Sequence, residues 1–197
     1  GMATTGSLTR WFRDELAADL PDEIAYQTLF DEAERIDPGA EGLLLLPYFS
    51  GERTPINDPK ARGIIAGLSL AHNRNHIFRA ILEGVAYGIR HNIDTFKDIG
   101  AEINRVIAVG GGTKSQHWLE IVSSVTGIDQ IIPEQTIGAS YGDAFLAGRV
   151  AGLLSHDDLR TWVNYKEEIH PDHHSQTVYE SLYDDYLNLY EQNKELL

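Results

Sequence analysis

Three consecutive glycines form the part of this sequence that is best suited to bind a ligand. Gly110, Gly111 and Gly112 follow the apolar, β-branched run 106–109, and a helical pattern over 116–125 comes directly after them. Glycine lacks a Cβ atom, so the chain can turn sharply there and a ligand can approach the backbone closely. The N-terminus of the following helix presents unpaired N–H groups and a partial positive charge. This geometry suits a nucleotide.

The same strand–glycine–helix corner also occurs as simple packing in α/β domains, and the glycines alone do not decide between packing and binding. They are contiguous, so they lack the G-x-G-x-x-G spacing of a Rossmann dinucleotide site and its acidic partner. The sequence also contains no G-x-x-x-x-G-K-[ST] phosphate loop. A Rossmann dehydrogenase is therefore a distant alternative, and a P-loop protein is excluded.

Other groups of reactive side chains favour structural roles. The histidine-rich stretch 170–174 lies in a predicted polar loop without regular ligand spacing, so we expect a solvated loop rather than a metal site. The serine pair 123–124 has no nucleophile-elbow sequence around it, which argues against acyl transfer. Glu52 and Arg53 could form an ion pair within a turn. None of these groups is assigned a catalytic or metal-binding role.

A second glycine-rich segment, 138–148, predicts a helix of small residues that packs closely against its neighbours. Asp143 is expected near the start of that helix, where a carboxylate is favourable without any catalytic role. Packing is the default interpretation of this segment.

These candidates must be positioned by alternating helices and strands. Hydrophobic spacing predicts helices near 8–16, 22–33, 75–96, 116–125, 139–151 and 179–189, and strands near 43–46, 63–68, 106–109 and 130–133. Ser7 is the expected cap of the first helix, and Pro21 or Asp22 is expected to open the second. An aromatic stripe on the last helix predicts core packing. Together the elements predict one α/β domain over 1–197, with helices flanking a mixed or parallel sheet.

The composition limits the classes of binding partner and the cellular setting that the protein can have. The 197 residues include 42% hydrophobic residues and no cysteine, which favours a folded cytoplasmic protein without disulfides or cysteine-bound metal. The net charge of −14 argues against nucleic acid or an anionic membrane as partner. No run approaches the length of a membrane span. Gly1 before Met2 is typical of the scar of a cleaved tag, so we expect an excised domain.

Several segments together resemble the FGGY family of carbohydrate kinases, in its C-terminal domain. Residues 46–55 (LPYFSGERTP) are similar to the LPY-x-SGERTP stretch of xylulokinases. Residues 63–68 (GIIAGL) and 76–83 (HIFRAILE) agree with the second signature of the family. Residues 110–118 (GGGTKSQHW) are similar to its adenosine-binding GGG-x-x-S-x-x-W, and the opening residues 5–11 (TGSLTRW) resemble its G-x-x-x-x-W helix start. The resemblance covers nearly the whole chain.

The resemblance implies an actin-like, ribonuclease-H-like ATPase fold in which two domains close on a cleft. It implies transfer of the γ-phosphoryl group of ATP to a hydroxyl of a sugar or polyol, with Mg²⁺ holding the phosphates. D-xylulose is the first expected substrate, and gluconate or another pentulose remains open. A non-catalytic nucleotide-binding or interaction domain of the same fold is the alternative.

The family's nucleotide contacts transfer to six positions of this chain. Gly111 and Gly112 would receive the adenosine and the α-phosphate, Ser115 and Gln116 would lie beside adenine or ribose, and the opposite wall would be formed by Gly6 and Arg10. The family's general base and its phosphate loop belong to the N-terminal, sugar-binding domain, which we expect to be absent here. The resemblance therefore assigns no catalytic residue to this chain, which we expect to be inactive alone. An excised domain could form a homodimer through the face that it normally buries, and the oligomeric state stays open.

Overall fold

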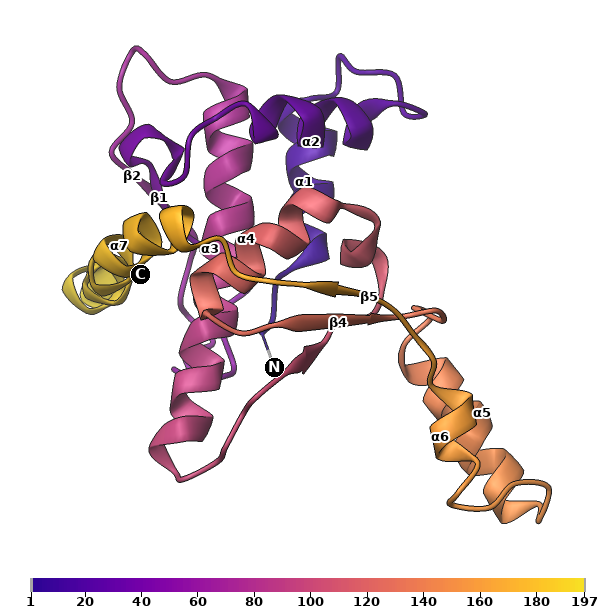
Figure 1. Ribbon diagram of the computed structural model, residues 1–197. Coiled ribbons are helices and arrows are strands. Elements are labelled where there is room, and N and C mark those ends of the chain that lie inside the picture. Colours follow the sequence, from indigo (N-terminus) through magenta and orange to yellow (C-terminus); the bar gives the residue numbers. More distant parts are fainter. Residues whose placement is uncertain (1, 197) are drawn as a thin grey trace.

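The structure is a computed structural model that describes residues 2–196 of the chain (Figure 1). The α-helices are α1 (Gly6–Leu16), α2 (Ala25–Glu34), α3 (Arg74–Asp98), α4 (Gln116–Thr126), α5 (Ala139–Val150), α6 (Leu159–Trp162) and α7 (His173–Asn193). The strands are β1 (Leu44–Leu46), β2 (Ile64–Ala66), β3 (Val106–Ile107), β4 (Gln130–Pro133) and β5 (Tyr165–Ile169). Short 3₁₀ turns lie at η1 (Ala40–Gly42), η2 (Gly111–Lys114) and η3 (Lys194–Leu196).

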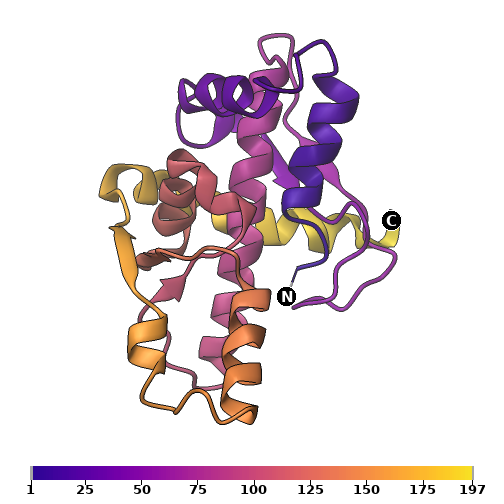
Figure 2. The same cartoon turned by 90° about the vertical axis from the view of Figure 1, so that its right-hand side faces the viewer.

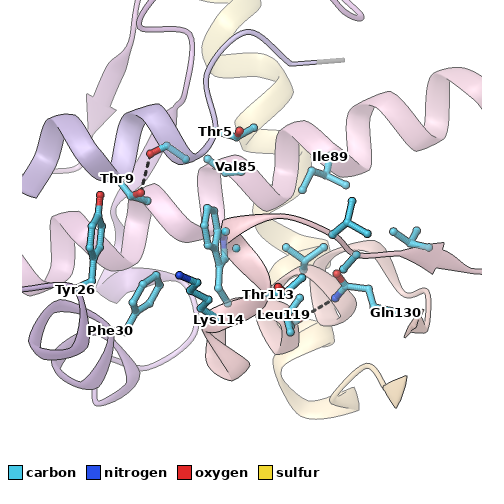
Figure 3. Close-up of a pocket in the computed structure, with 18 of the residues that line it drawn as sticks. Thr5, Thr9, Tyr26, Phe30, Val85, Ile89, Thr113, Lys114, Leu119 and Gln130 are labelled. Carbon is cyan, nitrogen blue, oxygen red and sulfur yellow. Dashed lines mark hydrogen bonds between the residues drawn. The ribbon is translucent and has the colours of Figure 1, made fainter. Parts of the chain in front are cut away.

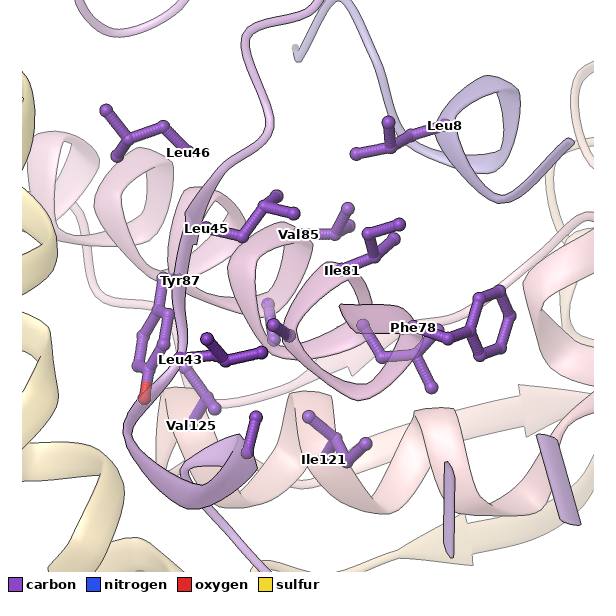
Figure 4. Close-up of a cluster of buried hydrophobic side chains, with 14 of the residues drawn as sticks. Leu8, Leu43, Leu45, Leu46, Phe78, Ile81, Val85, Tyr87, Ile121 and Val125 are labelled. Carbon is purple, nitrogen blue, oxygen red and sulfur yellow. The ribbon is translucent and has the colours of Figure 1, made fainter. Parts of the chain in front are cut away.

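The long helix α3 forms the centre of the molecule. Its start is fixed by a capping box, in which Asn73 Oδ1 accepts from Asn75 N at 2.9 Å and Asn73 N donates to His76 Nδ1 at 3.1 Å. Ile81 and Val85, four residues apart, are both at most 1% exposed. Side chains from α1, β1 and α4 surround this stretch (Figure 4). The predicted helix over 75–96 is thus confirmed, and it runs slightly further at both ends.

A two-stranded antiparallel sheet packs on α3. β1 and β2 pair with Leu45 opposite Ile65, which confirms the predicted strands in shortened form. β1 can approach the helix because α3 carries Gly84 at the contact. A Cβ atom there would lie only 2.4 Å from the carbonyl oxygen of Leu45. On the same side, the tyrosines of α7 at 179, 183 and 186 are buried, which confirms that this aromatic stripe is core packing.

A three-stranded sheet completes the fold. β3 pairs with β4 in parallel and β5 pairs with β4 antiparallel, so the predicted mixed sheet is confirmed. One face contacts α4 through Leu119, Ile132 and Ile169. α5 and α6 follow β4 and extend away from the helical core (Figure 1), and they form the lower end of the molecule in Figure 2.

Two predicted helix starts are wrong. α1 begins at Gly6 with Thr5 at its cap position, so Ser7 lies inside the first turn, and no side chain caps this helix. α2 begins at Ala25, because residues 22–24 form a turn in which the N–H groups of Ile24 and Ala25 both donate to Pro21 O.

The end of the chain departs from the expectation in other ways. Asp143 is the fifth residue of α5, beyond the first turn, where the helix dipole has little effect on a side chain. The strand β5 was not predicted, because only Ile169 of its five residues is buried and the sequence shows no apolar alternation. No helix among the described residues is both long and apolar enough to cross a membrane.

Candidate functional site

A cavity of about 770 Å³ opens between the helical core and the three-stranded sheet. Its walls come from α1, α2, α3, β3, η2, α4 and the start of β4, which lie far apart in the sequence. Figure 3 shows Thr5 and Thr9 on one side, Tyr26 and Phe30 next to them, and Lys114 reaching in from the glycine turn. The cavity is therefore assembled only when the tertiary fold is complete.

The glycine turn forms one wall. Gly110 has a φ of 89°, a backbone conformation that strongly favours glycine. The turn η2 that follows is closed by Thr113, whose N–H and hydroxyl both donate to the carbonyl oxygen of Gly110 at 3.2 and 2.7 Å. The strand is shorter than expected, since β3 ends at Ile107. Gly111 and Gly112 lie within the 3₁₀ turn η2, which precedes helix α4.

Packing does not explain the other two glycines. A Cβ atom at Gly111 would meet no atom within 4 Å, and one at Gly112 would meet only the Trp118 ring, at 3.5 Å. Both residues line the cavity. Their missing side chains thus leave space on the cavity side, where a ligand can reach the backbone.

The N-terminal end of α1 forms the opposite wall. Gly6 and Arg10 both line the cavity, as the sequence predicts for one wall of a nucleotide site. Thr9, which the sequence did not single out, lies between them and donates its hydroxyl to the carbonyl oxygen of Gly6 at 2.9 Å. A Cβ atom at Gly6 would also meet no atom within 4 Å.

The two remaining predicted residues lie behind the glycine wall. Ser115 is buried and caps α4, with its Oγ accepting from Trp118 N at 3.2 Å. Gln116 is exposed and donates to Glu120 Oε1 at 3.2 Å. Neither residue is among those that line the cavity. Both are at the helix start, as expected, and their contact with a nucleotide remains a prediction.

Aromatic side chains supply an apolar wall that sequence reasoning did not identify. Tyr26 and Phe30 of α2 face the cavity (Figure 3). Trp118 of α4 lines it as well. The Phe30 and Trp118 rings have their centroids 6.2 Å apart. Flat rings of this kind suit a flat heteroaromatic ligand. The helical periodicity predicts only that Phe30 lies on the apolar face of its helix. It does not predict that this face lies beside the glycine turn.

The charge of the cavity differs from that of the chain. The chain carries 30 acidic and 16 basic residues, yet no Asp or Glu lines this cavity among the described residues. Arg10 and Lys114 both line it, and neither forms an ion pair with another described residue. Two available cations next to exposed backbone N–H groups favour an anionic ligand.

A second cavity, of about 430 Å³, lies next to the first, and Ile107 and Val109 line both. Its lining includes Tyr141, Phe145 and Trp162 from α5 and α6, together with Glu134. It contains no Lys or Arg among the described residues. This cavity is therefore much less suited to a polyphosphate than the first one.

The other reactive groups have structural partners. His170 Nδ1 lies 2.9 Å from Asp129 Oδ1, and Asp172 caps α7, with Oδ2 accepting from Ser175 N at 2.8 Å. The stretch 170–174 is thus partly helical and not wholly a loop. Asp129, Glu168 and His170 have ligand atoms within 4.8 Å of one another, an exposed group that the sequence did not bring together.

The serine pair and the Glu52–Arg53 pair are also part of the framework. Ser123 is fully buried and donates to the carbonyl oxygen of Ile169 at 3.0 Å. Glu52 is 3% exposed, and its Oε1 accepts from the backbone N–H groups of Ala3 at 2.9 Å and Arg53 at 2.7 Å. The Glu52 carboxylate is thus held by backbone N–H groups from two parts of the chain.

The family of the chain follows from comparison with known proteins. Residues 1–151 match the C-terminal domain of the FGGY family of carbohydrate kinases. The chain belongs to this family. It is 32% identical over 188 residues to the xylulose kinase of Bacillus subtilis strain 168, covering 94% of this chain and 37% of that protein. It is 35% identical over 153 residues to the glycerol kinase of Shewanella piezotolerans, covering 76% of this chain and 30% of that protein.

Solved structures agree with this assignment. The xylulose kinase from Rhodospirillum rubrum superimposes with a TM-score of 0.86 at 37% identity, covering 99% of this chain and 39% of that one. The actin-like ATPase fold predicted for this FGGY chain is therefore confirmed. The chain spans only 37–39% of the length of these two xylulose kinases.

Proposed function

We propose that this chain supplies the ATP-binding part of a sugar kinase that phosphorylates a hydroxyl of a ketose such as D-xylulose. Membership of a carbohydrate-kinase family and the likeness to two xylulose kinases support the reaction class and the first substrate to test. The likeness to a glycerol kinase keeps other polyols within the range of substrates to be measured.

The observation that carries the proposal is the meeting of two glycine-containing walls on one cavity. Gly6 and Arg10 lie on one side, and Gly111 and Gly112 lie on the other. ATP, when bound, supplies the phosphoryl group that is transferred. This chain would hold the adenine against the aromatic wall and the phosphates near Lys114, in a cavity whose open backbone fits such a ligand.

The described residues do not provide a site for Mg²⁺ next to that ligand. Mg²⁺ in kinase sites is usually held by one or two carboxylates and the substrate phosphates. No carboxylate lines the cavity among residues 2–196. We therefore assign no metal-binding residue here and derive no step through the metal.

The chain also contains no residue that we assign as the general base. Asp143 is exposed on α5, and Asp58 Oδ2 accepts from the Tyr190 hydroxyl at 2.9 Å, so neither is placed on the cavity. We propose that the base and the sugar contacts belong to a further domain of a longer protein. A cytoplasmic location and a homodimer of this chain remain predictions.

Calorimetric titration of the chain with ATP tests the proposal. Gly111→Val should weaken ATP binding about tenfold or more, because the new side chain fills the approach to the backbone without meeting a protein atom. Gly142→Val is the matched control, since a Cβ atom there also meets nothing within 4 Å and the residue does not line the first cavity. Equal ATP affinity of the wild-type chain and Gly111→Val would contradict the proposed site.

The activity itself is measured with a panel of sugars and coupled detection of ADP. The chain alone should release no sugar-dependent ADP, whereas the full-length protein should do so with D-xylulose or a related polyol. Sugar-dependent ADP release by the chain alone would contradict the placement of the base. A full-length protein that binds ATP but phosphorylates no sugar would favour the non-catalytic alternative.

A further inference from the structure

A buried ion pair lies behind the glycine turn. Arg79 and Glu83 of α3 are 3% and 2% exposed, and Arg79 Nε donates to Glu83 Oε1 at 2.6 Å. The same carboxylate oxygen accepts from Gly39 N at 3.0 Å and from the Tyr179 hydroxyl at 3.1 Å. Removing two charges from water is costly unless each finds several partners, and this carboxylate does. Arg79 is thereby held in one position.

One arm of the fixed guanidinium points at α4. Arg79 Nη2 donates to the Tyr179 hydroxyl at 2.8 Å, while Nη1 lies 2.6 Å from His117 Nε2. A guanidinium has no acceptor, so His117 Nε2 must accept and its proton must lie on Nδ1. That nitrogen faces Glu120 Oε2 at 3.9 Å. Burial and the charge of Arg79 lower the pKa of His117 to about 4, so the imidazole stays neutral and accepts near neutral pH.

The next residue of α4 is held by the same helix. Trp118 Nε1 donates to the carbonyl oxygen of Leu82 at 3.2 Å. Successive residues of an α-helix project about 100° apart around its axis. One hydrogen bond to α3 would fix only the distance between the two helices. Two hydrogen bonds from adjacent residues also fix the rotation of α4 about its own axis.

The first turn of α4 is continuous with the glycine turn. Ser115, the last residue before α4, caps the helix through the N–H of Trp118 at 3.2 Å, and its own N–H donates to the carbonyl oxygen of Gly112 at 3.2 Å. The Trp118 ring lies 3.5 Å from where a Cβ atom of Gly112 would be. A rotation of α4 would therefore move the backbone of the glycine wall relative to α1.

We propose that Arg79 and His117 are positioning residues for the nucleotide turn, with Arg79 setting the rotation of α4 through His117 and so the place of Gly111 and Gly112. This inference rests on the proposed function for its effect on ATP. Neither residue lines the cavity, so their effect on the ligand passes through the backbone that they hold.

The test compares two substitutions of one residue by calorimetry with ATP, well below the melting temperature. His117→Leu removes the acceptor and should weaken ATP binding about tenfold. His117→Gln keeps an acceptor at a similar reach and should bind within about twofold of the wild-type chain. Ile93→Ala is the stability control, because Ile93 is buried in α3 and does not line the cavity. It should bind ATP normally despite a lower melting temperature.

A measurement without ligand separates this inference from the proposed function. In ¹H–¹⁵N spectra of the ligand-free chain, the Gly111 and Gly112 signals should move in His117→Leu and stay near their wild-type positions in His117→Gln. Unchanged glycine signals in His117→Leu, or equal displacement in both variants, would overturn the positioning role. Absence of ATP binding by the wild-type chain, with the glycine signals displaced as expected, would overturn the proposed function alone.

Discussion

The helical core and the three-stranded sheet with its helical extension are stabilised to very different degrees. The core buries a large set of side chains from α1, α2, α3, α4, α7 and β1 around α3. The sheet side has a cluster of only three buried residues, Leu119, Ile132 and Ile169. In the extension, Phe145 is the single buried residue of α5, and Val150 is 91% exposed. The proposed nucleotide cavity lies at the junction between these two regions.

Helix α4 joins the two regions because its side chains belong to both clusters. Ile121 and Val125 pack in the core around α3, while Leu119 packs on the sheet. The well-packed core therefore positions the α1 wall of the cavity directly. Through α4 it also holds the glycine turn, which forms the opposite wall. The contact of Arg79 with His117 is a polar link between α3 and α4 in this arrangement.

The largest expected effect comes from breaking a charge pair in the core. Arg79→Met would leave Glu83 buried without its cation and should lower the free energy of unfolding by about 3–5 kcal/mol. His170→Met on the sheet side should change it very little, because the His170–Asp129 pair is exposed to solvent. Urea denaturation of both variants measures the contrast, and a similar loss in the two would break the distinction between the regions.

Smaller effects are expected when the pH is changed, and they have opposite signs for His117 and His170. The pKa of His117 is lowered to about 4, chiefly by burial. As the pH falls, the imidazole of His117 is therefore protonated in the unfolded chain before it is protonated in the folded chain. The contribution of His117 to the free energy of unfolding falls as the pH drops from about 6.5 towards 4. The pKa of His170 is raised by its hydrogen bond to Asp129. Its contribution is fully present below the unfolded pKa and is lost as the pH rises through the higher folded pKa.

Urea denaturation of His117→Gln and His170→Gln between pH 5 and 8, each compared with the wild-type chain, isolates the two histidines. The stability of His117→Gln relative to wild type should rise towards acid pH, and that of His170→Gln should fall. Parallel pH profiles for the two variants would show that the two histidines do not experience the different environments described here.

The sequence predicted the regular elements well where burial gives a strong pattern. The isoleucines and the single valine of α3, repeating every four residues, predicted that helix, and the short stretch 130–133, with two isoleucines before a proline, predicted β4. The polar strand β5 was missed because its pairing with β4 satisfies the backbone while leaving four of its five side chains exposed. Ser7 was wrongly predicted as the cap because serine is only statistically preferred at that position. In the structure the helix begins earlier, and Thr5 occupies the cap position.

The candidate site was predictable in part. The family resemblance pointed to Gly6, Arg10, Gly111 and Gly112, and the structure brings these four onto one cavity. The aromatic wall could not be predicted, because the sequence distance between α2 and α4 hides which of their faces meet. The role of Ser115 as a buried helix cap likewise depends on the local backbone rather than on the motif in which it occurs.

The most direct test of the nucleotide site is a ¹H–¹⁵N spectrum of the labelled chain during addition of ADP. The proposed cavity predicts that Gly6 and Thr9 of α1 shift together with Gly111 and Gly112 of the opposite wall, at one common affinity. Shifts confined to Tyr141 and Phe145 around the second cavity, or no shifts at millimolar ADP, would contradict the proposal that this chain holds the nucleotide between α1 and the glycine turn.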